Sequence, residues 1–105
     1  MKFPQDYTLL EQINYLQRQI IICSIVYYEL DDNLVSDYVY DSWCKQLVEL
    51  QAECEEVEQS NLWYVYYDFD GSTGFDLFYR LTDEDKEEFK QLASKKRLED
   101  FGIVN

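Results

Sequence analysis

Two stretches of the chain carry apolar residues at the spacing of an amphipathic helix. Apolar side chains recur every three or four residues from Leu9 to Tyr27, and again from Tyr40 to Val57. This is the period of a helix with one apolar stripe. The sequence therefore predicts helices over residues 7–30 and 36–58, folded antiparallel as a helical hairpin. Ser36 is placed to cap the second helix, because serine is a favoured N-cap residue.

The rest of the sequence predicts a β-hairpin and a third helix. Residues 62–69 are dense in aromatic and β-branched side chains, which are typical of strands. Residues 70–74 have turn composition, and residues 75–81 return as a second strand. Thr82 and the acidic residues after it resemble a capping box that opens a helix over residues 82–97. We therefore predict an α+β fold, in the order ααββα, for a single domain of residues 1–105. It comprises a helical hairpin (7–58), a β-hairpin (62–81) and a C-terminal helix (82–97).

The bend between the first two helices carries a motif whose spacing is hard to obtain by chance. Its residues are Tyr27, Tyr28, Asp31, Val35, Asp37, Tyr40 and Asp41. The motif resembles the N-terminal subdomain of NAD-dependent DNA ligases, a helical hairpin that closes over the nicotinamide mononucleotide half of NAD. The likeness covers about residues 7–58. It implies that Tyr28 takes an adjacent aromatic position, and that the nicotinamide and ribose contacts fall to Tyr27, Asp37, Tyr40 and Asp41.

Two departures from the ligase pattern separate the hairpin from the ligase activity. The ligases place His or Arg just before the tyrosines, where this chain has the apolar stretch of residues 22–26. The Lys-x-Asp-Gly motif that carries the ligase adenylate is absent, and 105 residues leave no room for its domain. The sequence also lacks histidine, the usual general base. We therefore expect a protein that is not an enzyme, with no catalytic residues.

The net charge of −13 is concentrated on the elbow and the second helix. Residues 31–60 hold nine acidic side chains against Lys45 alone. Such a field repels nucleic acid and attracts basic surfaces, although a solvated helix face is an equal alternative. The predicted partner-binding residues are Asp31, Asp32, Asp37, Asp41, Glu49, Glu53 and Glu56.

A second short motif, residues 68–72, resembles the nucleophile loop of haloacid-dehalogenase phosphatases. About thirty residues follow it, too few for the parallel sheet which that chemistry needs. A plain turn is the preferred interpretation, and a divalent ion held by Asp68, Asp70 and Asp76 is an alternative. The three cysteines are expected to be free thiols, and no zinc site is predicted.

These observations lead to two hypotheses of function and a third of a different kind. The leading hypothesis is a small acidic inhibitor of a basic nucleic-acid-binding protein, such as a Cas or restriction nuclease. It would act by nucleic-acid mimicry and not bind nucleic acid directly. We expect a cytoplasmic protein. A phage or mobile-element origin, which would place it in the host cytoplasm, is an impression of resemblance. The alternative function is a ligase-like module that binds NAD or nicotinamide mononucleotide. The third hypothesis is a purely structural module or a homodimer, with exposed tyrosines on the β-hairpin. No membrane segment is expected.

Overall fold

The described part of the chain is entirely helical. The computed structural model describes residues 1–72 and 76–100, the last two as helix backbone, and holds no strand within these ranges. The predicted α+β fold is therefore wrong. The helices are α1 (Leu9–Tyr28), α2 (Asp37–Glu53), α3 (Trp63–Tyr66), α4 (Leu77–Arg80) and α5 (Asp83–Asp100), with a 3₁₀ turn, η1 (Val57–Gln59), between α2 and α3.

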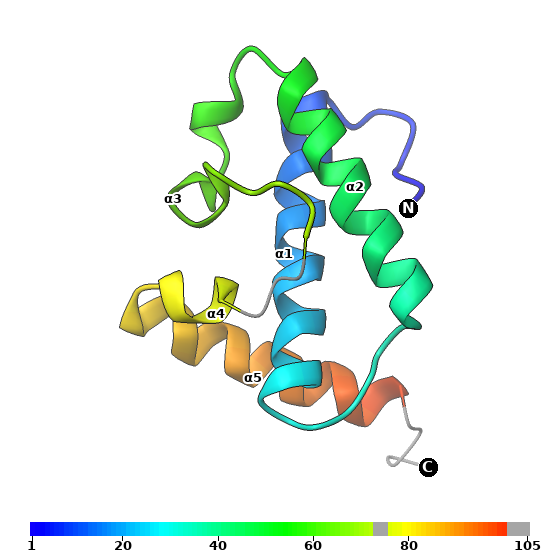
Figure 1. Ribbon diagram of the computed structural model, residues 1–105, viewed down its shortest axis with the longest axis vertical. Coiled ribbons are helices and arrows are strands. Elements are labelled where there is room, and N and C mark those ends of the chain that lie inside the picture. The colour runs from blue at the N-terminus through cyan, green and yellow to red at the C-terminus, as the bar shows by residue number, and fades with distance from the viewer. Residues whose placement is uncertain (73–75, 101–105) are drawn as a thin grey trace.

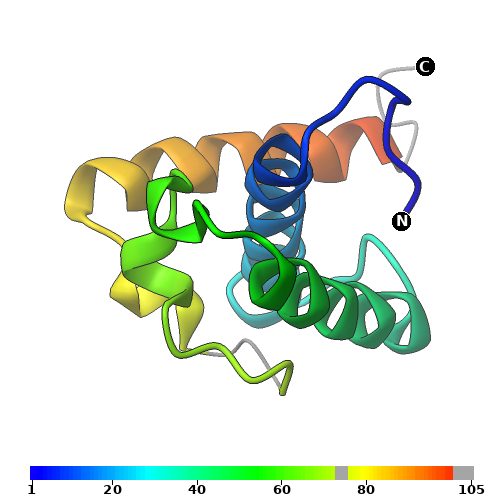
Figure 2. The same ribbon diagram turned by 90° about the horizontal axis from the view of Figure 1, so that it is seen from above.

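Helix α1 is the central element, and the other helices pack around it. Figure 1 shows α2 running antiparallel beside α1, while α5 crosses the C-terminal half of α1. Viewed from above, α2 and α5 lie on different sides of α1, and the short helices α3 and α4 occupy a third (Figure 2). The residues from Ile20 to Val26 are all buried. An all-round apolar helix segment of this kind requires cover on every side.

The predicted helical hairpin is confirmed, with shorter helices than expected. Thr8 caps α1 through a capping box with Glu11, whose N–H it accepts at 3.2 Å. Ser36 caps α2 as predicted, accepting the N–H of Val39 at 3.2 Å. Helix α2 ends at Glu53 rather than at residue 58, where the chain turns into η1. The predicted C-terminal helix is also confirmed as α5.

The predicted strand over residues 62–69 is instead the helical turn α3. Leu62, Val65 and Tyr66 are buried, whereas Tyr64 and Tyr67 are exposed. Burial at intervals of three and four is the helical period, so the chain meets the core on one face of a turn. An isolated two-stranded hairpin is marginally stable, and the helical turn satisfies its backbone groups locally. The high aromatic content of residues 62–69 therefore reflects packing on the core and does not indicate a strand.

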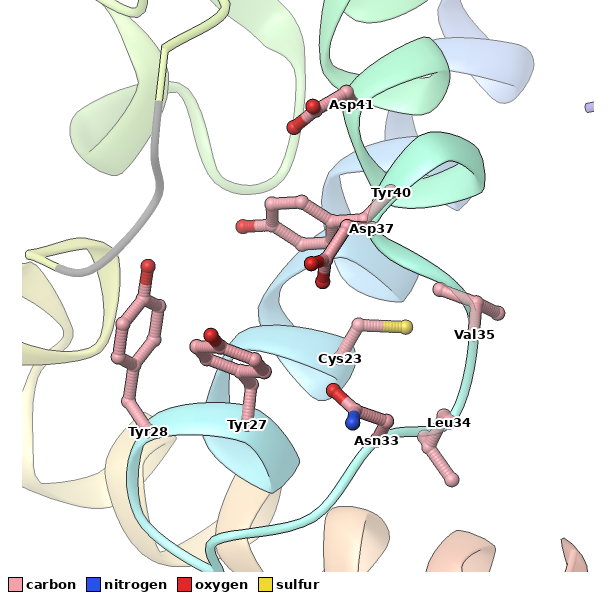
Figure 3. A pocket seen from close by; sticks show the side chains of 9 residues that line it. All are labelled: Cys23, Tyr27, Tyr28, Asn33, Leu34, Val35, Asp37, Tyr40 and Asp41. Atoms are coloured by element: carbon pink, nitrogen blue, oxygen red, sulfur yellow. The ribbon is translucent and has the colours of Figure 1, made fainter.

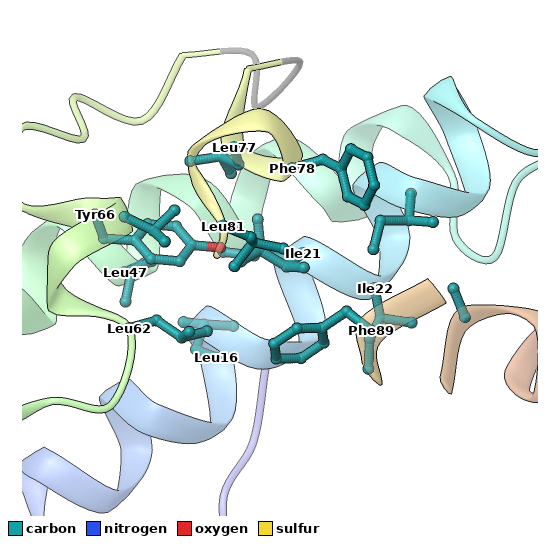
Figure 4. Packing of buried hydrophobic residues seen from close by; sticks show 14 of the residues in the cluster. Leu16, Ile21, Ile22, Leu47, Leu62, Tyr66, Leu77, Phe78, Leu81 and Phe89 are labelled. Atoms are coloured by element: carbon teal, nitrogen blue, oxygen red, sulfur yellow. The ribbon is translucent and has the colours of Figure 1, made fainter. Parts of the chain in front are cut away.

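The predicted second strand is likewise wrong where the chain is described. Residues 73–75 lie outside the described residues, and α4 follows them. Leu77, Phe78 and Leu81 are buried in the common core (Figure 4). The guanidinium of Arg80 joins the two short helices, donating to Val65 O at 3.0 Å and to the carboxylate of Asp68.

A buried polar network fixes α3 against α1. Gln17 is fully buried in the middle of α1. Its amide nitrogen donates to Ser60 Oγ at 3.1 Å and to Gln51 Oε1 at 3.0 Å, and its amide oxygen accepts the N–H of Leu62 at 3.3 Å. The Tyr66 hydroxyl donates to Gln17 O at 2.7 Å. Because buried polar groups are costly when unpaired, this network specifies one position for α3.

Candidate functional site

The elbow between α1 and α2 reverses the chain through one residue in the left-handed conformation. Asp31 has φ +53, a conformation that Asp and Asn adopt more readily than most side chains. The Asp32 N–H bonds back to Val26 O at 3.0 Å, and the Leu30 N–H to Ile25 O at 3.1 Å. The end of α1 is thereby closed and the start of α2 is brought back beside it.

An ion pair from α5 holds the elbow in place. Arg97 Nε lies 3.0 Å from Asp32 Oδ2. The Asn33 N–H and then the Arg97 guanidinium stabilise the Asp32 carboxylate, so its pKa lies below the usual range. Asp32 is therefore engaged within the protein. Asp31, its neighbour, is exposed.

The end of α1 presents two tyrosines to solvent. Tyr27 and Tyr28 are 47% and 43% exposed, although the helical period predicted Tyr27 on the core stripe. Their rings meet edge to face, with centroids 4.8 Å apart. Tyr27 therefore does not lie in the hairpin core.

Tyr40 forms a fixed wall between the two helices. Its hydroxyl lies 2.7 Å from Ser24 Oγ, so α1 and α2 are joined by a hydrogen bond. Burial raises the pKa of the Tyr40 hydroxyl well above its usual value, and it therefore stays protonated. The ring has a defined position before any ligand arrives.

These side chains enclose a pocket at the elbow of about 220 Å³. Figure 3 shows Tyr27, Asp37 and Tyr40 directed into one space between the end of α1 and the start of α2. Asp37 and Asp41, one turn apart on α2, are exposed, and their carboxylates make no hydrogen bond or ion pair with any described residue. The pocket thus combines aromatic faces with two free carboxylates.

All five residues predicted to contact a cofactor line this one pocket: Tyr27, Tyr28, Asp37, Tyr40 and Asp41. The sequence reasoning missed Cys23 and Asn33, which also line it. Cys23 stands four residues before Tyr27, so helical spacing could have revealed it. Asn33 lies in the irregular elbow, where no periodic signal exists.

The predicted partner-binding residues form a stripe rather than a compact patch. On α2, exposed carboxylates fall four residues apart at Asp37, Asp41, Glu49 and Glu53, and Lys45 interrupts the series. At 1.5 Å per residue the stripe is about 24 Å long. Glu56 is exposed but lies beyond the end of α2, just before η1.

The aspartates of residues 68–76 serve the fold. Asp68 and Asp76 both pair with Arg80, and the guanidinium holds the pKa of Asp68 below its usual range. The Asp70 carboxylate accepts the N–H of Ser72 at 3.0 Å. Gly71, with φ +86, brings this loop against α2, where a Cβ would meet Val48 Cγ2 at 3.2 Å. No cluster of potential metal ligands occurs within residues 1–72 and 76–98.

Comparison with protein families, curated proteins and solved structures finds no match to this chain. Among the helices in the described ranges, none combines the length and the apolar character needed to cross a bilayer.

Proposed function

We propose that this protein is a non-catalytic binding module for the nicotinamide riboside part of NAD or nicotinamide mononucleotide. The observation that carries the proposal is that the five motif residues expected to contact the ligand, which lie between positions 27 and 41, line a single open pocket. The helical hairpin places these residues around one pocket, and the ligase-like motif provides its aromatic rings and carboxylates.

The size of the pocket favours one half of the dinucleotide. A volume of about 220 Å³ equals the liquid volume of about seven water molecules at about 30 Å³ each. It is also below the range of about 300–1,000 Å³ typical for drug-sized ligands. There is room for one ring and its sugar, while a second nucleotide would extend into solvent.

The lining suits a flat cation bearing hydroxyl groups. Oxidised nicotinamide is a pyridinium, and tyrosine faces attract cations. The exposed ring of Tyr27 offers such a face, while Asp37 and Asp41 supply negative charge and accept hydrogen bonds from ribose hydroxyls. Among the described residues, no basic side chain lines the pocket, so a phosphate attached to the ribose would point outward.

Calorimetric titration with nicotinamide mononucleotide tests this proposal. We expect a dissociation constant of about 0.1–1 mM for a half-open site. Tyr27→Ala removes the stacking face and should abolish measurable binding, whereas Tyr38→Ala should leave it unchanged. Tyr38 is the matched control because it is 82% exposed, lies at the start of α2 close to the elbow, and does not line the pocket.

The charge on the pocket provides a second comparison. Asp37→Asn should weaken binding about tenfold, and Glu49→Gln, farther along the same stripe, should not. The neutral dihydronicotinamide form should also bind about tenfold more weakly than the oxidised cation. Absence of heat with every nicotinamide ligand, or equal binding by Tyr27→Ala, contradicts the proposal.

The acidic stripe on α2 supports a second candidate function, inhibition of a basic nucleic-acid-binding protein. Glu49 and Glu53 are exposed and form no ion pair with any described residue. The stripe is nevertheless sparse, with four carboxylates over about 24 Å, whereas duplex DNA carries one charge per about 1.7 Å. We therefore place this candidate second.

A competition assay distinguishes the two candidates. The inhibitor hypothesis predicts that the protein releases DNA or guide RNA from a Cas or restriction nuclease, and that salt suppresses this effect. The double variant Glu49→Gln/Glu53→Gln should then lose the effect, and Tyr27→Ala should retain it. If no candidate nuclease loses its nucleic acid, the hypothesis fails.

A further inference from the structure

A second cavity lies on the opposite side of α1 from α2, where α5 crosses it. It has a volume of about 240 Å³ and is lined from α1 by Tyr15, Arg18 and Gln19, and from α5 by Lys95 and Lys96. We call it the α1–α5 groove. Its floor is apolar, since Ile22 is buried there.

The α1–α5 groove gathers positive charge on a strongly acidic protein. Three of the nine lysine and arginine residues of the chain line it, although the net charge is −13. Within the described residues, the side chains of Arg18, Lys95 and Lys96 form no hydrogen bond or ion pair. By contrast, both Arg80 and Arg97 are neutralised by aspartates. No described carboxylate therefore neutralises the three cations of the groove.

Part of the groove is held in position by aromatic contacts. Tyr15 packs edge-on against Phe3 and Tyr7, with each pair of ring centroids 6.2 Å apart. Its ring is thus fixed as a wall of the groove, and the residue is 41% exposed. Gln19 adds an amide that can donate to an oxygen atom.

We propose that the α1–α5 groove binds the phosphate group of a small phosphorylated ligand. Two lysines and one arginine converging from two helices match a multiply charged oxyanion, and charge-assisted hydrogen bonds are the strongest of their kind. The apolar floor and the Tyr15 ring accept the organic part of the ligand. This site is independent of the elbow pocket, whose described lining includes no basic side chain.

The net negative charge of the protein favours the binding of a small ligand over that of nucleic acid. At physiological ionic strength charges are screened beyond about 8 Å, so a small phosphate in the groove interacts mainly with its immediate cations. A nucleic acid strand extends over many times that length and meets the acidic remainder of the surface. This distribution of charge over the surface therefore favours a compact phosphate ligand.

Nitrogen-15 NMR titration with inorganic pyrophosphate tests the proposal. We expect amide shifts centred on residues 15–19 and 92–96, with a dissociation constant of about 1 mM at low salt. Arg18→Gln should weaken binding about tenfold, and Lys95→Gln/Lys96→Gln should weaken it further. Lys2→Gln, which removes one exposed base outside the groove, should leave it unchanged.

The proposal is overturned if about 10 mM pyrophosphate causes no shifts, if the shifts are confined to other surfaces, or if the well-folded Arg18→Gln variant binds pyrophosphate equally well. A single-stranded oligonucleotide of about ten residues serves as the second source of phosphate. Tighter binding of the oligonucleotide than of pyrophosphate overturns the assignment to a small ligand.

Discussion

Replacing Gln17 by methionine should destabilise the protein far more than a typical polar substitution. Gln17 is fully buried, and its amide group forms hydrogen bonds with Ser60, Gln51 and Leu62 at distances between 3.0 and 3.3 Å. Methionine has nearly the same shape but leaves the buried Leu62 N–H and the Ser60 hydroxyl without their partner. Each unsatisfied buried group costs about 1–3 kcal/mol. Because Gln51 is only half-buried and reaches water, we expect a total loss of about 3 kcal/mol.

Urea unfolding followed by far-ultraviolet circular dichroism measures this loss. For a domain of this size 3 kcal/mol corresponds to a fall in Tm of about 12–20 °C. Gln91→Met is the matched control, since Gln91 is exposed on α5 and its side chain bonds, within the described part of the chain, to Glu87 alone. The control should change the free energy of unfolding by less than about 0.5 kcal/mol. A similarly small change for Gln17→Met would refute the argument that this network holds α3 on α1.

Three further predictions follow from the capping and packing interactions. Arg80→Gln removes the bonds to Asp68 and to the α3 backbone, and because Arg80 is partly exposed we expect a loss of about 1–2 kcal/mol by urea unfolding. Ser36→Ala removes the α2 cap and should cost about 1 kcal/mol, whereas Ser36→Gly should cost only a few tenths. Burial raises the pKa of Cys44 from 9.0 to about 11, and that of Tyr66 well above 10.0. Both groups bind more protons in the folded state than in the unfolded state. The free energy of unfolding should therefore keep its full value below pH 9 and fall, for each group, by about 1.4 kcal/mol per pH unit above that group's unfolded pKa. A free energy of unfolding that stays constant between pH 9 and 11 contradicts this.

The helical hairpin could be predicted because its signals are local and repeated. The apolar period of α1 persists over five turns, and Ser36 lies where a cap is needed. The same reasoning failed after Ser60 because the segment is short. In a segment of only a few residues, a helical turn and a strand are distinguished by which side chains are buried. Here the hydrogen bonds from Gln17 on α1 to Ser60 and Leu62 determine which side chains face the core.

The elbow pocket shows the same division between local and tertiary information. The spacing of the motif residues predicted the five side chains that line it. Their exposure could not be predicted, because it depends on how the reversal at Asp31 and the ion pair of Arg97 set the angle between the helices. The α1–α5 groove left no signal at all, since Arg18 and Lys95 are 77 positions apart in the chain.

A map of amide chemical shifts during titration with nicotinamide mononucleotide tests directly whether the elbow pocket binds this ligand. We expect saturable shifts at Cys23, Tyr27, Asn33, Asp37 and Asp41, which surround the elbow pocket. Nicotinamide riboside should reproduce these shifts, because the pocket contacts only the ring and the sugar. Absence of shifts at the elbow at about 10 mM ligand would contradict the central claim, as would shifts confined to the α1–α5 groove.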